Sequence, residues 1–472
     1  MFSVFDMKQP PIWTITKVFW ISKVLQYTII FFTPCIESQF DTSTTLLLDN
    51  FPQLDQSQWY NAKILNKLLS WDSAYYLKNI LHMAQTPDGI YLPEYENEYA
   101  FSPFVWSSVL RFSVKALLLK EDTPFLLLVL ISITNIIHYC STIALFYLTR
   151  IVFQKNSMYK YQKQTVFRIA MFTCLLFIFS LSGGFQSTFY SEQFSTLFTF
   201  LGMYTREYST KYTGSFTITI ENKALYLLTS VFFTVAAVNR PNCVINGLFF
   251  LLDLQKFIFN KTSQHSELKN KLNDHRKREA LYPLFSGCFM LCGMVYTVYY
   301  TPFQIFCNTS NSADNLPNWC NNSLLSQLEL LKLNSLVPTF VTRNSLYTYI
   351  QRRYWNVGLL TYYTANNIPN VLIALPNVIY LFMAANYFQW DFNSFNLHSY
   401  CYVSFAFLIM ICGWAHLQII NRVITFIPLH LWYLSSCFAK NGNSLKVKLY
   451  LAWVIIWWPL QTVLFANFLP PA

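Results

Sequence analysis

Apolar residues recur along the chain in runs of about 17 to 25, the length at which a helix crosses a bilayer. Polar segments separate the runs, and most of the charged residues lie in those segments. The pattern predicts an all-α polytopic membrane protein with roughly eleven transmembrane helices and lumenal loops. The expected spans lie near residues 12–33, 124–149, 168–182, 194–205, 224–238, 243–259, 281–301, 369–388, 400–416, 424–438 and 449–466.

Basic connecting segments set the expected orientation of these spans. Lysine and arginine gather between the second and third spans, after the fourth, and again in 261–279 and 440–448, which indicates the cytoplasmic side. The first run carries Lys17 and Lys23 and lacks a small-residue cleavage site after it, so it is interpreted as an uncleaved signal anchor. The run 104–119 contains two basic residues and is interpreted as an interfacial amphipathic helix.

These assignments divide the chain into five parts. The first holds a cytoplasmic tail and the signal anchor, the second a lumenal loop with a candidate catalytic acid and the interfacial helix, and the third transmembrane helices with basic loops. A second large lumenal loop follows, and then the C-terminal transmembrane helices. The boundaries of the parts are 1–34, 35–123, 124–301, 302–368 and 369–472.

Glycosylation sequons and two cysteines agree with a lumenal loop at 302–368. Asn308 and Asn321 begin sequons there and are expected to carry glycans. Asn260 begins a third sequon in the basic loop and is expected to stay unmodified. Cys307 and Cys320 flank a polar stretch and would pair if that stretch is lumenal.

Composition supports the membrane assignment and narrows the partners. Hydrophobic residues make up 54% of the chain and charged residues 12%, whereas soluble chains carry about a quarter charged residues. The net charge of +11 lies mostly in a few connecting segments, which suggests topology signals and anionic lipid headgroups rather than nucleic acid. No cysteine or histidine spacing indicates a metal site.

Acidic residues gather beside aromatic ones in the first long polar segment. Trp71 precedes Asp72, and Glu94, Glu96 and Glu98 follow among tyrosines and phenylalanine. A carboxylate against aromatic walls can be partly desolvated, which raises its basicity. The alternative is a solvated loop whose acids only keep it soluble.

Asp72 would suit one reaction in particular, transfer from a sugar phosphate. A single carboxylate can act as a general base worth about 10²–10⁴ in rate. A second carboxyl group is not needed, because phosphate leaves readily, but positive charge must stabilise it as it leaves. The candidate cations on the lumenal side are Arg240, Arg352, Arg353, His416 and Arg422.

For the arginines we also predict how close they lie to the candidate catalytic acid. Arg352, Arg353 and Arg422 are expected to lie close to Asp72, with Arg422 or Arg353 favoured over Arg240 as the phosphate ligand. The alternative is that each cation extends to the nearest lipid headgroups. Glu192, at the end of a span, is expected either to support the site or simply to pair with one of these cations.

Several stretches, in order and over nearly the whole chain, form a specific pattern. They are Trp71-Asp-Ser-Ala-Tyr-Tyr76, Tyr95-Glu-Asn-Glu-Tyr-Ala-Phe-Ser-Pro103, Phe189-Tyr-Ser-Glu192, Asn239-Arg-Pro-Asn242, the region from Trp319-Cys-Asn-Asn-Ser through Gln351-Arg-Arg-Tyr-Trp-Asn-Val-Gly358 to Ile368-Pro-Asn370, and Val463-Leu-Phe-Ala-Asn-Phe-Leu469. Together they resemble the GPI mannosyltransferase 2 family, the second mannosyltransferases of glycosylphosphatidylinositol (GPI) anchor assembly. The chain departs from that family's pattern at Pro241, Cys243 and Ser102.

This resemblance implies a multi-pass enzyme of the endoplasmic reticulum membrane with a GT-C-like glycosyltransferase fold. The implied reaction moves mannose from dolichyl-phosphate mannose to the one-mannose GPI precursor, forms an α-1,6 bond with inversion, and uses no cofactor. Asp72 is then the catalytic position, with Trp71 and Glu96 supporting it. The implied partners are the two glycolipids, the membrane and, for fungal members, a small membrane accessory subunit.

Two other classes of function remain open at this point. A multispanning lipid transporter or scramblase would place ionisable residues deep within spans, whereas most charges here lie at span ends or in loops. The halves of the chain also show no inverted repeat. A non-catalytic subunit of a GPI-assembly complex would leave the sequence unchanged but would make Asp72 dispensable.

Overall fold

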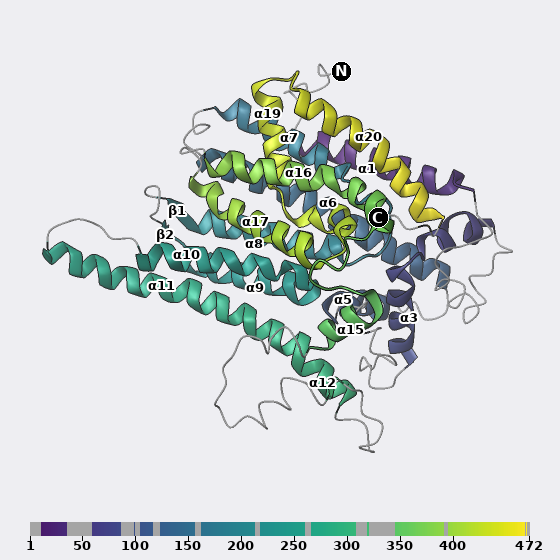
Figure 1. Ribbon diagram of the computed structural model, residues 1–472, viewed down its shortest axis with the longest axis horizontal. Helices are drawn as coiled ribbons and strands as arrows, with labels where there is room; N and C mark the ends of the chain where they lie inside the picture. Colours follow the sequence, from purple (N-terminus) through teal and green to yellow (C-terminus); the bar gives the residue numbers. More distant parts are fainter. Residues whose placement is uncertain are drawn as a thin grey trace.

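The computed structural model describes residues 11–34, 59–85, 99, 104–116, 123–155, 162–212, 218–259, 266–307, 319–320, 345–390, 395–467 and 469. Over these residues the protein is a bundle of helices with one two-stranded β-hairpin (Figure 1). The expected all-α class is confirmed.

Each expected span coincides with a helix. The helices are α1 (Pro11–Phe32), α6 (Thr123–Lys155), α7 (Lys163–Ile178), α8 (Glu192–Ser209), α9 (Lys223–Asn239), α10 (Gly247–Phe259), α11 (Ser266–Val295), α16 (Ile368–Gln389), α17 (His398–Trp414), α19 (Leu429–Lys440) and α20 (Leu445–Ala466). Among the described residues, five helical stretches are long and apolar enough to cross a membrane: Ile12–Phe32, Thr123–Lys155, Lys277–Phe306, Ala365–Gln389 and Leu445–Ala466. The protein is therefore a multi-pass membrane protein.

The other expected spans fall on shorter helices, for identifiable reasons. The expected span 424–438 is divided, because the turn η12 (Ile424–Phe426) and Pro428 precede α19. Proline lacks the backbone N–H that a helix interior uses, and Pro428 lies directly before the first residue of α19, where that N–H is not needed. α8 carries the buried charges Arg206 and Glu207 in its last turn, which lower its apolar content.

The hairpin closes one end of the bundle. Strand β1 (Thr210–Tyr212) pairs antiparallel with β2 (Ile218–Ile220) directly after α8. Beside it, Arg206 is fully buried and donates to both oxygens of Asp253, at 2.8 and 2.5 Å, and to Glu207 at 3.0 Å. Because each charge has a partner, this network joins α8 to α10 without leaving a buried ion unpaired.

Shorter helices gather at the opposite end of the bundle. They are α3 (Asp72–Gln85), α5 (Phe104–Ala116), α12 (Thr301–Phe306) and α15 (Leu346–Trp355), which lie together at the lower right of Figure 1, whereas β1 and β2 lie at the left. α5 confirms the helix expected over 104–119. Short 3-10 and π-helical turns complete the path: η2 (Asn61–Leu65), η3 (Asn66–Leu68), η4 (Gly183–Gln186), η5 (Pro241–Asn246), η6 (Tyr296–Tyr300), η9 (Ala365–Asn367), η10 (Phe395–Leu397), η11 (Leu417–Ile419) and α18 (Ile420–Val423), a single helical turn.

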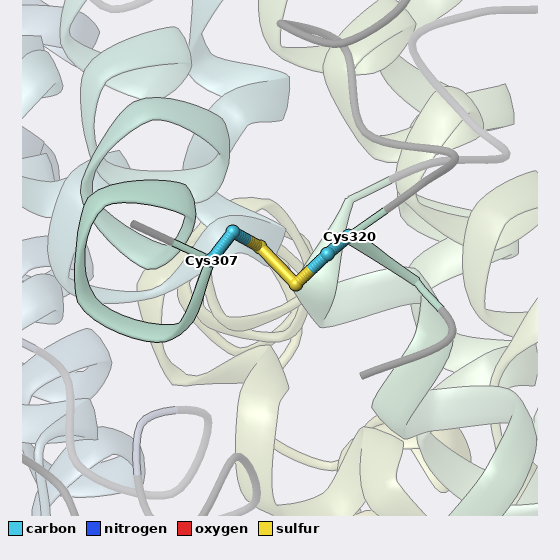
Figure 2. The surroundings of a disulfide bond; sticks show 2 residues. All are labelled: Cys307 and Cys320. Carbon is cyan, nitrogen blue, oxygen red and sulfur yellow. A yellow bond between two sulfur atoms is a disulfide. The ribbon is translucent and has the colours of Figure 1, made fainter. Parts of the chain in front are cut away.

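A disulfide fastens α15 to this end of the bundle. Cys307, which follows α12, is bonded to Cys320, with 5.7 Å between their Cα atoms (Figure 2). The pairing expected from the sequence is confirmed. Cys320 and its neighbour Trp319 pack against Leu346 and Ile350 of α15 in a small apolar cluster of its own.

Candidate active site

Asp72 is placed by an unusual turn at the start of α3. Trp71, immediately before it, has a backbone φ of 57°, in the left-handed region that bulky side chains rarely adopt. Such strain persists only where the surrounding structure fixes it, and it occurs often at functional sites. Asp72 itself lies in the first turn of α3, where the helix dipole favours a negative charge.

Hydrogen bonds from distant segments hold that turn in place. The Tyr190 hydroxyl donates to the Ser70 carbonyl at 2.8 Å, and the Thr188 hydroxyl donates to the Leu68 carbonyl at 2.8 Å. The Ser70 hydroxyl in turn lies 3.0 Å from the Phe465 carbonyl at the end of α20. The segment before α3 is therefore bound both to the η4–α8 connection and to the C-terminal helix.

The centre of the site is a cluster of four charged side chains from four parts of the chain. Arg422, on α18, donates to Oδ2 of Asp72 and to Oε1 of Glu192. Arg240, at the end of α9, donates to the same Oε1 of Glu192. The side chains of Asp72 and Glu192 are 14% and 7% exposed, so these ion pairs are largely shielded from water.

Two aromatic rings fix the orientation of the Arg422 guanidinium. Its carbon lies 4.7 Å from the ring centroid of Phe185 and 4.7 Å from that of Tyr190. Cations are attracted to aromatic faces, most strongly where water is excluded. The planar fork is thus held against two rings, which are themselves in edge-to-face contact with 5.2 Å between their centroids, while its nitrogens reach two carboxylates.

Asn239 joins the helices that carry the rest of the cluster. Its amide nitrogen donates to the Ser191 carbonyl at 3.1 Å and to the Ser195 hydroxyl at 2.7 Å, at the start of α8. Its amide oxygen accepts from the Trp106 backbone N–H of α5 at 3.1 Å. Because Asn239 directly precedes Arg240, these bonds position Arg240 against Glu192. The sequence singles out Asn239-Arg-Pro-Asn242 as part of the family pattern and Arg240 as a candidate cation, but it gives Asn239 no role of its own.

Burial keeps the neighbouring tyrosines protonated. It raises the pKa of Tyr76 and of Tyr190, and the charge of Asp72 raises both further while the arginines oppose the rise. Both phenols therefore remain neutral hydrogen-bond donors at physiological pH. Oε2 of Glu192 and Nε of Arg240 are buried without a hydrogen-bond partner among the residues that the structure describes. Buried polar atoms of this kind have unused bonding capacity for a polar ligand.

Other residues expected at the site lie elsewhere. Arg352 and Arg353 are exposed on α15, and the Arg353 guanidinium lies 6.0 Å from the centre of the Tyr349 ring. The structure places Arg422 against Asp72, as expected. Among the described residues no ion pair joins Arg352 or Arg353 to Asp72, and both side chains are exposed in the last turn of α15. Arg240, and not Arg353, contacts the charged cluster, and which arginine binds the phosphate stays a prediction.

His416 has a packing role in this structure rather than a place among the four charges. Its ring stacks on Tyr362, with 5.0 Å between the ring centroids. Burial lowers the pKa of His416, so it is neutral near pH 7. Glu96, Asn308 and Asn321 lie outside the described residues, as do Glu94, Glu98 and Asn260. Within the described residues, no group of three or more His, Cys, Asp and Glu side chains could hold a metal ion.

The fold is that of a multi-pass membrane protein, and the family comparison defines its class as a membrane mannosyltransferase. A family model described as mannosyltransferase (PIG-V) matches residues 12–393 and 389–472 of the chain. The chain belongs to this mannosyltransferase family, and it is an enzyme. The family predicted from the sequence is confirmed.

Relatives match over nearly the full length. GPI mannosyltransferase 2 of Saccharomyces cerevisiae is 37% identical over 477 residues, which cover 97% of this chain and 99% of the relative. GPI mannosyltransferase 2 of Eremothecium gossypii is 38% identical over 472 residues, with the same coverage. The crystal structure of the Archaeoglobus fulgidus oligosaccharyltransferase in the apo form aligns with a TM-score of 0.49 at 12% identity. That alignment covers 97% of this chain and 56% of the archaeal chain.

Proposed function

We propose that the protein transfers the second mannose, through an α-1,6 bond, from dolichyl-phosphate mannose to the one-mannose GPI precursor. The reaction takes place at the lumenal face of the endoplasmic reticulum membrane. Family membership and the names of the relatives support the reaction class. The observation that carries the mechanism is the pairing of Asp72 with Arg422, which places a base beside a cation in a shielded site.

Asp72 acts as the general base in this proposal. Arg422 occupies Oδ2, so Oδ1 accepts the proton of the acceptor hydroxyl. The hydroxyl oxygen forms a bond to the anomeric carbon of mannose while the bond from that carbon to the phosphate oxygen breaks. The electron pair of the broken bond leaves with dolichyl phosphate. Attack from the opposite face converts the β-linked donor into an α-linked product.

The arginines balance charge during this step. Before transfer, Arg422 is paired with the negative charge of Asp72. When Asp72 takes a proton, that charge disappears at the moment when the departing phosphate gains one. Arg422, together with Arg240, then stabilises the phosphate, and the site keeps the same net charge throughout. A fixed dipole or charge that needs no rearrangement is the most effective kind of transition-state stabilisation.

The proposed reaction needs no cofactor, because the donor already carries a good leaving group. Both lipids enter from the bilayer between helices, with their tails remaining in it. The proposal also includes a small membrane accessory subunit, for which the family resemblance is the sole support.

Reconstitution tests the proposal directly. The purified protein in liposomes with dolichyl-phosphate mannose and a one-mannose GPI precursor is expected to form a two-mannose product that an α-1,6-mannosidase cleaves. Cells depleted of the protein are expected to accumulate the one-mannose precursor. A protein that moves lipids between leaflets without forming this product would instead be a scramblase. If cells need the protein but a variant that lacks Asp72 still supports them, the protein is a non-catalytic subunit.

The lumenal position of the site has its own test, through glycosylation. We expect Asn308 or Asn321 to carry a glycan and Asn260 to carry none, because the basic loop after Asn260 should remain cytoplasmic. Cys307 and Cys320 directly precede the sequons at Asn308 and Asn321, and the disulfide between these cysteines supports an oxidising side for both sequons. Single Asn→Gln variants, compared by mobility before and after endoglycosidase, measure this. A glycan on Asn260 would place the proposed site on the wrong side of the membrane.

A further inference from the structure

α1 carries a polar stripe on one face of an otherwise apolar helix. Lys23, Gln26 and Tyr27 are spaced three and four residues apart, so they share that face. Lys23 and Gln26 are 3% and 1% exposed, although both lie within a stretch that is long and apolar enough to cross a membrane. Ionisable side chains in such stretches are rare, because their removal from water is costly, and they usually mark functional sites.

The polar stripe is bonded to the η4 turn. Its three side chains donate to three backbone carbonyls of the turn and of the residue after it: Lys23 to Gln186 at 2.6 Å, Gln26 to Gly183 at 2.5 Å and Tyr27 to Ser187 at 2.8 Å. Lys23 also donates to the amide oxygen of Gln26 at 3.4 Å. Among the described residues, the hydrogen-bond partners of Lys23 are therefore uncharged oxygens and not a carboxylate. The bonds also give partners to carbonyls of a turn that is itself buried.

The same turn is held from another side by α20. The Gly184 backbone N–H donates to the amide oxygen of Gln461. The two segments approach so closely that a Cβ added at Gly184 would lie 2.4 Å from the Cβ of Phe465. α1 and α20 lie side by side (Figure 1). The η4 turn is therefore fixed by two helices at once.

The segment that begins with this turn supplies most of the contacts of Arg422. Phe185 belongs to η4, and Tyr190 and Glu192 follow within seven residues. The Arg422 guanidinium lies 4.7 Å from the ring centroids of Phe185 and Tyr190 and donates to Glu192. Because Phe185 lies inside the turn whose carbonyls α1 binds, a shift of the turn would move a ring that packs on the guanidinium.

We propose that Lys23 is a positioning residue of the active site. Through its bond to Gln186 it holds the η4 turn in place, with Gln26 and Tyr27 beside it, and so keeps Phe185 against Arg422. This inference rests on the proposed function of Arg422 and adds to it a residue of the first helix, outside the four charges. Lys23 acts through the turn and takes no part in the chemistry.

Lys23→Met tests the assignment, with Lys17→Met as the matched control. Methionine has an unbranched apolar side chain but no donor. Lys17 is exposed on the same helix, with its amine 5.0 Å from the centre of the Trp13 ring. Both changes remove one positive charge from α1, so an effect on membrane insertion would appear in both.

We expect kcat in liposomes, per folded protein, to fall about 10- to 100-fold in Lys23→Met, since a misplacement of about 1 Å can cost about 100-fold. The loss should appear in kcat, because the guanidinium matters most as the phosphate gains charge in the transition state. The KM for the acceptor should equal that of the wild type, as should both constants of Lys17→Met.

Further measurements separate positioning from a purely structural role. Hydrogen exchange of the backbone amides of 183–191 should be faster in Lys23→Met than in Lys17→Met, because the turn has lost a contact. Combined with Arg422→Lys, Lys23→Met should add little further loss in kcat, since both changes act on the same guanidinium. Gln26→Leu removes the neighbouring bond to the turn and should change exchange and kcat in the same direction, which provides the test if Lys23→Met does not fold.

Three outcomes would overturn the assignment. They are equal exchange of 183–191 in the two lysine variants, faster exchange with unchanged kcat, and losses in kcat that multiply in the double variant. Absence of a two-mannose product from the wild type would contradict the proposed function instead. In that case the exchange measurement still decides whether Lys23 holds the turn, because it requires no turnover.

Discussion

Asp72→Asn is expected to abolish measurable mannosyl transfer while the protein remains folded and inserted in the membrane. The substitution is nearly isosteric, and an amide oxygen can still accept a hydrogen bond from Arg422. An amide does not take up a proton at neutral pH, so the acceptor hydroxyl loses its base, at a cost of about 10²–10⁴ in rate. Initial rates in liposomes with saturating donor measure the loss.

A second carboxylate provides the control for this experiment. Glu221 is 57% exposed and pairs with Lys211 at 3.4 Å beside the hairpin, at the end of the bundle opposite the site. Glu221→Gln makes the same chemical change and should leave the rate within about twofold of wild type, because exposed ion pairs contribute little. Turnover of Asp72→Asn equal to that of this control would remove Asp72 from the catalytic role.

Arg422→Lys is expected to lower kcat/KM for the donor by about 10²–10³, the effect of losing one fixed donor to a developing negative charge. Lysine keeps the positive charge but lacks the planar fork. It therefore cannot reach Asp72 and Glu192 together while it packs against the rings of Phe185 and Tyr190. The same liposome assay, with donor concentration varied, measures the change.

Arg353→Lys is the matched control, because Arg353 is exposed on α15 and contacts only a ring of its own helix in the described contacts. We expect its turnover to equal that of the wild type. Normal turnover in Arg422→Lys would show that the charge alone suffices and that the fork has no part in the reaction.

The sequence predicted the chemistry of the site better than its geometry. Asp72 stands out because a carboxylate beside aromatic residues in a membrane protein is unusual, and one of the two expectations for Glu192 is that it pairs with a cation. The structure shows that pairing twice, with Arg240 and with Arg422. Arg352 and Arg353 make no described contact with the cluster, and an adjacent pair of arginines in a sequence does not show where the packing of its helix will carry either side chain.

Other features depend on contacts that no local pattern encodes. The rings of Phe185 and Tyr190 contact Arg422 only because the η4–α8 connection passes beside α18, more than 200 residues later in the chain. The left-handed backbone of Trp71 is held by hydrogen bonds of its neighbours to segments beyond residue 180. The lengths of the apolar runs located the helices, because a run of about 20 apolar residues matches the thickness of a bilayer, but run length does not report which loops meet.

The four charges of the cluster sum to zero, since Asp72 and Glu192 offset Arg240 and Arg422. A neutral cluster exerts no long-range attraction on passing anions and gathers no counterions. Soluble phosphates and sugar nucleotides are therefore not drawn to the site from solution. In the proposed reaction both substrates instead arrive by diffusion within the bilayer, so that selection begins with the lipid tail, before any contact with the sugar.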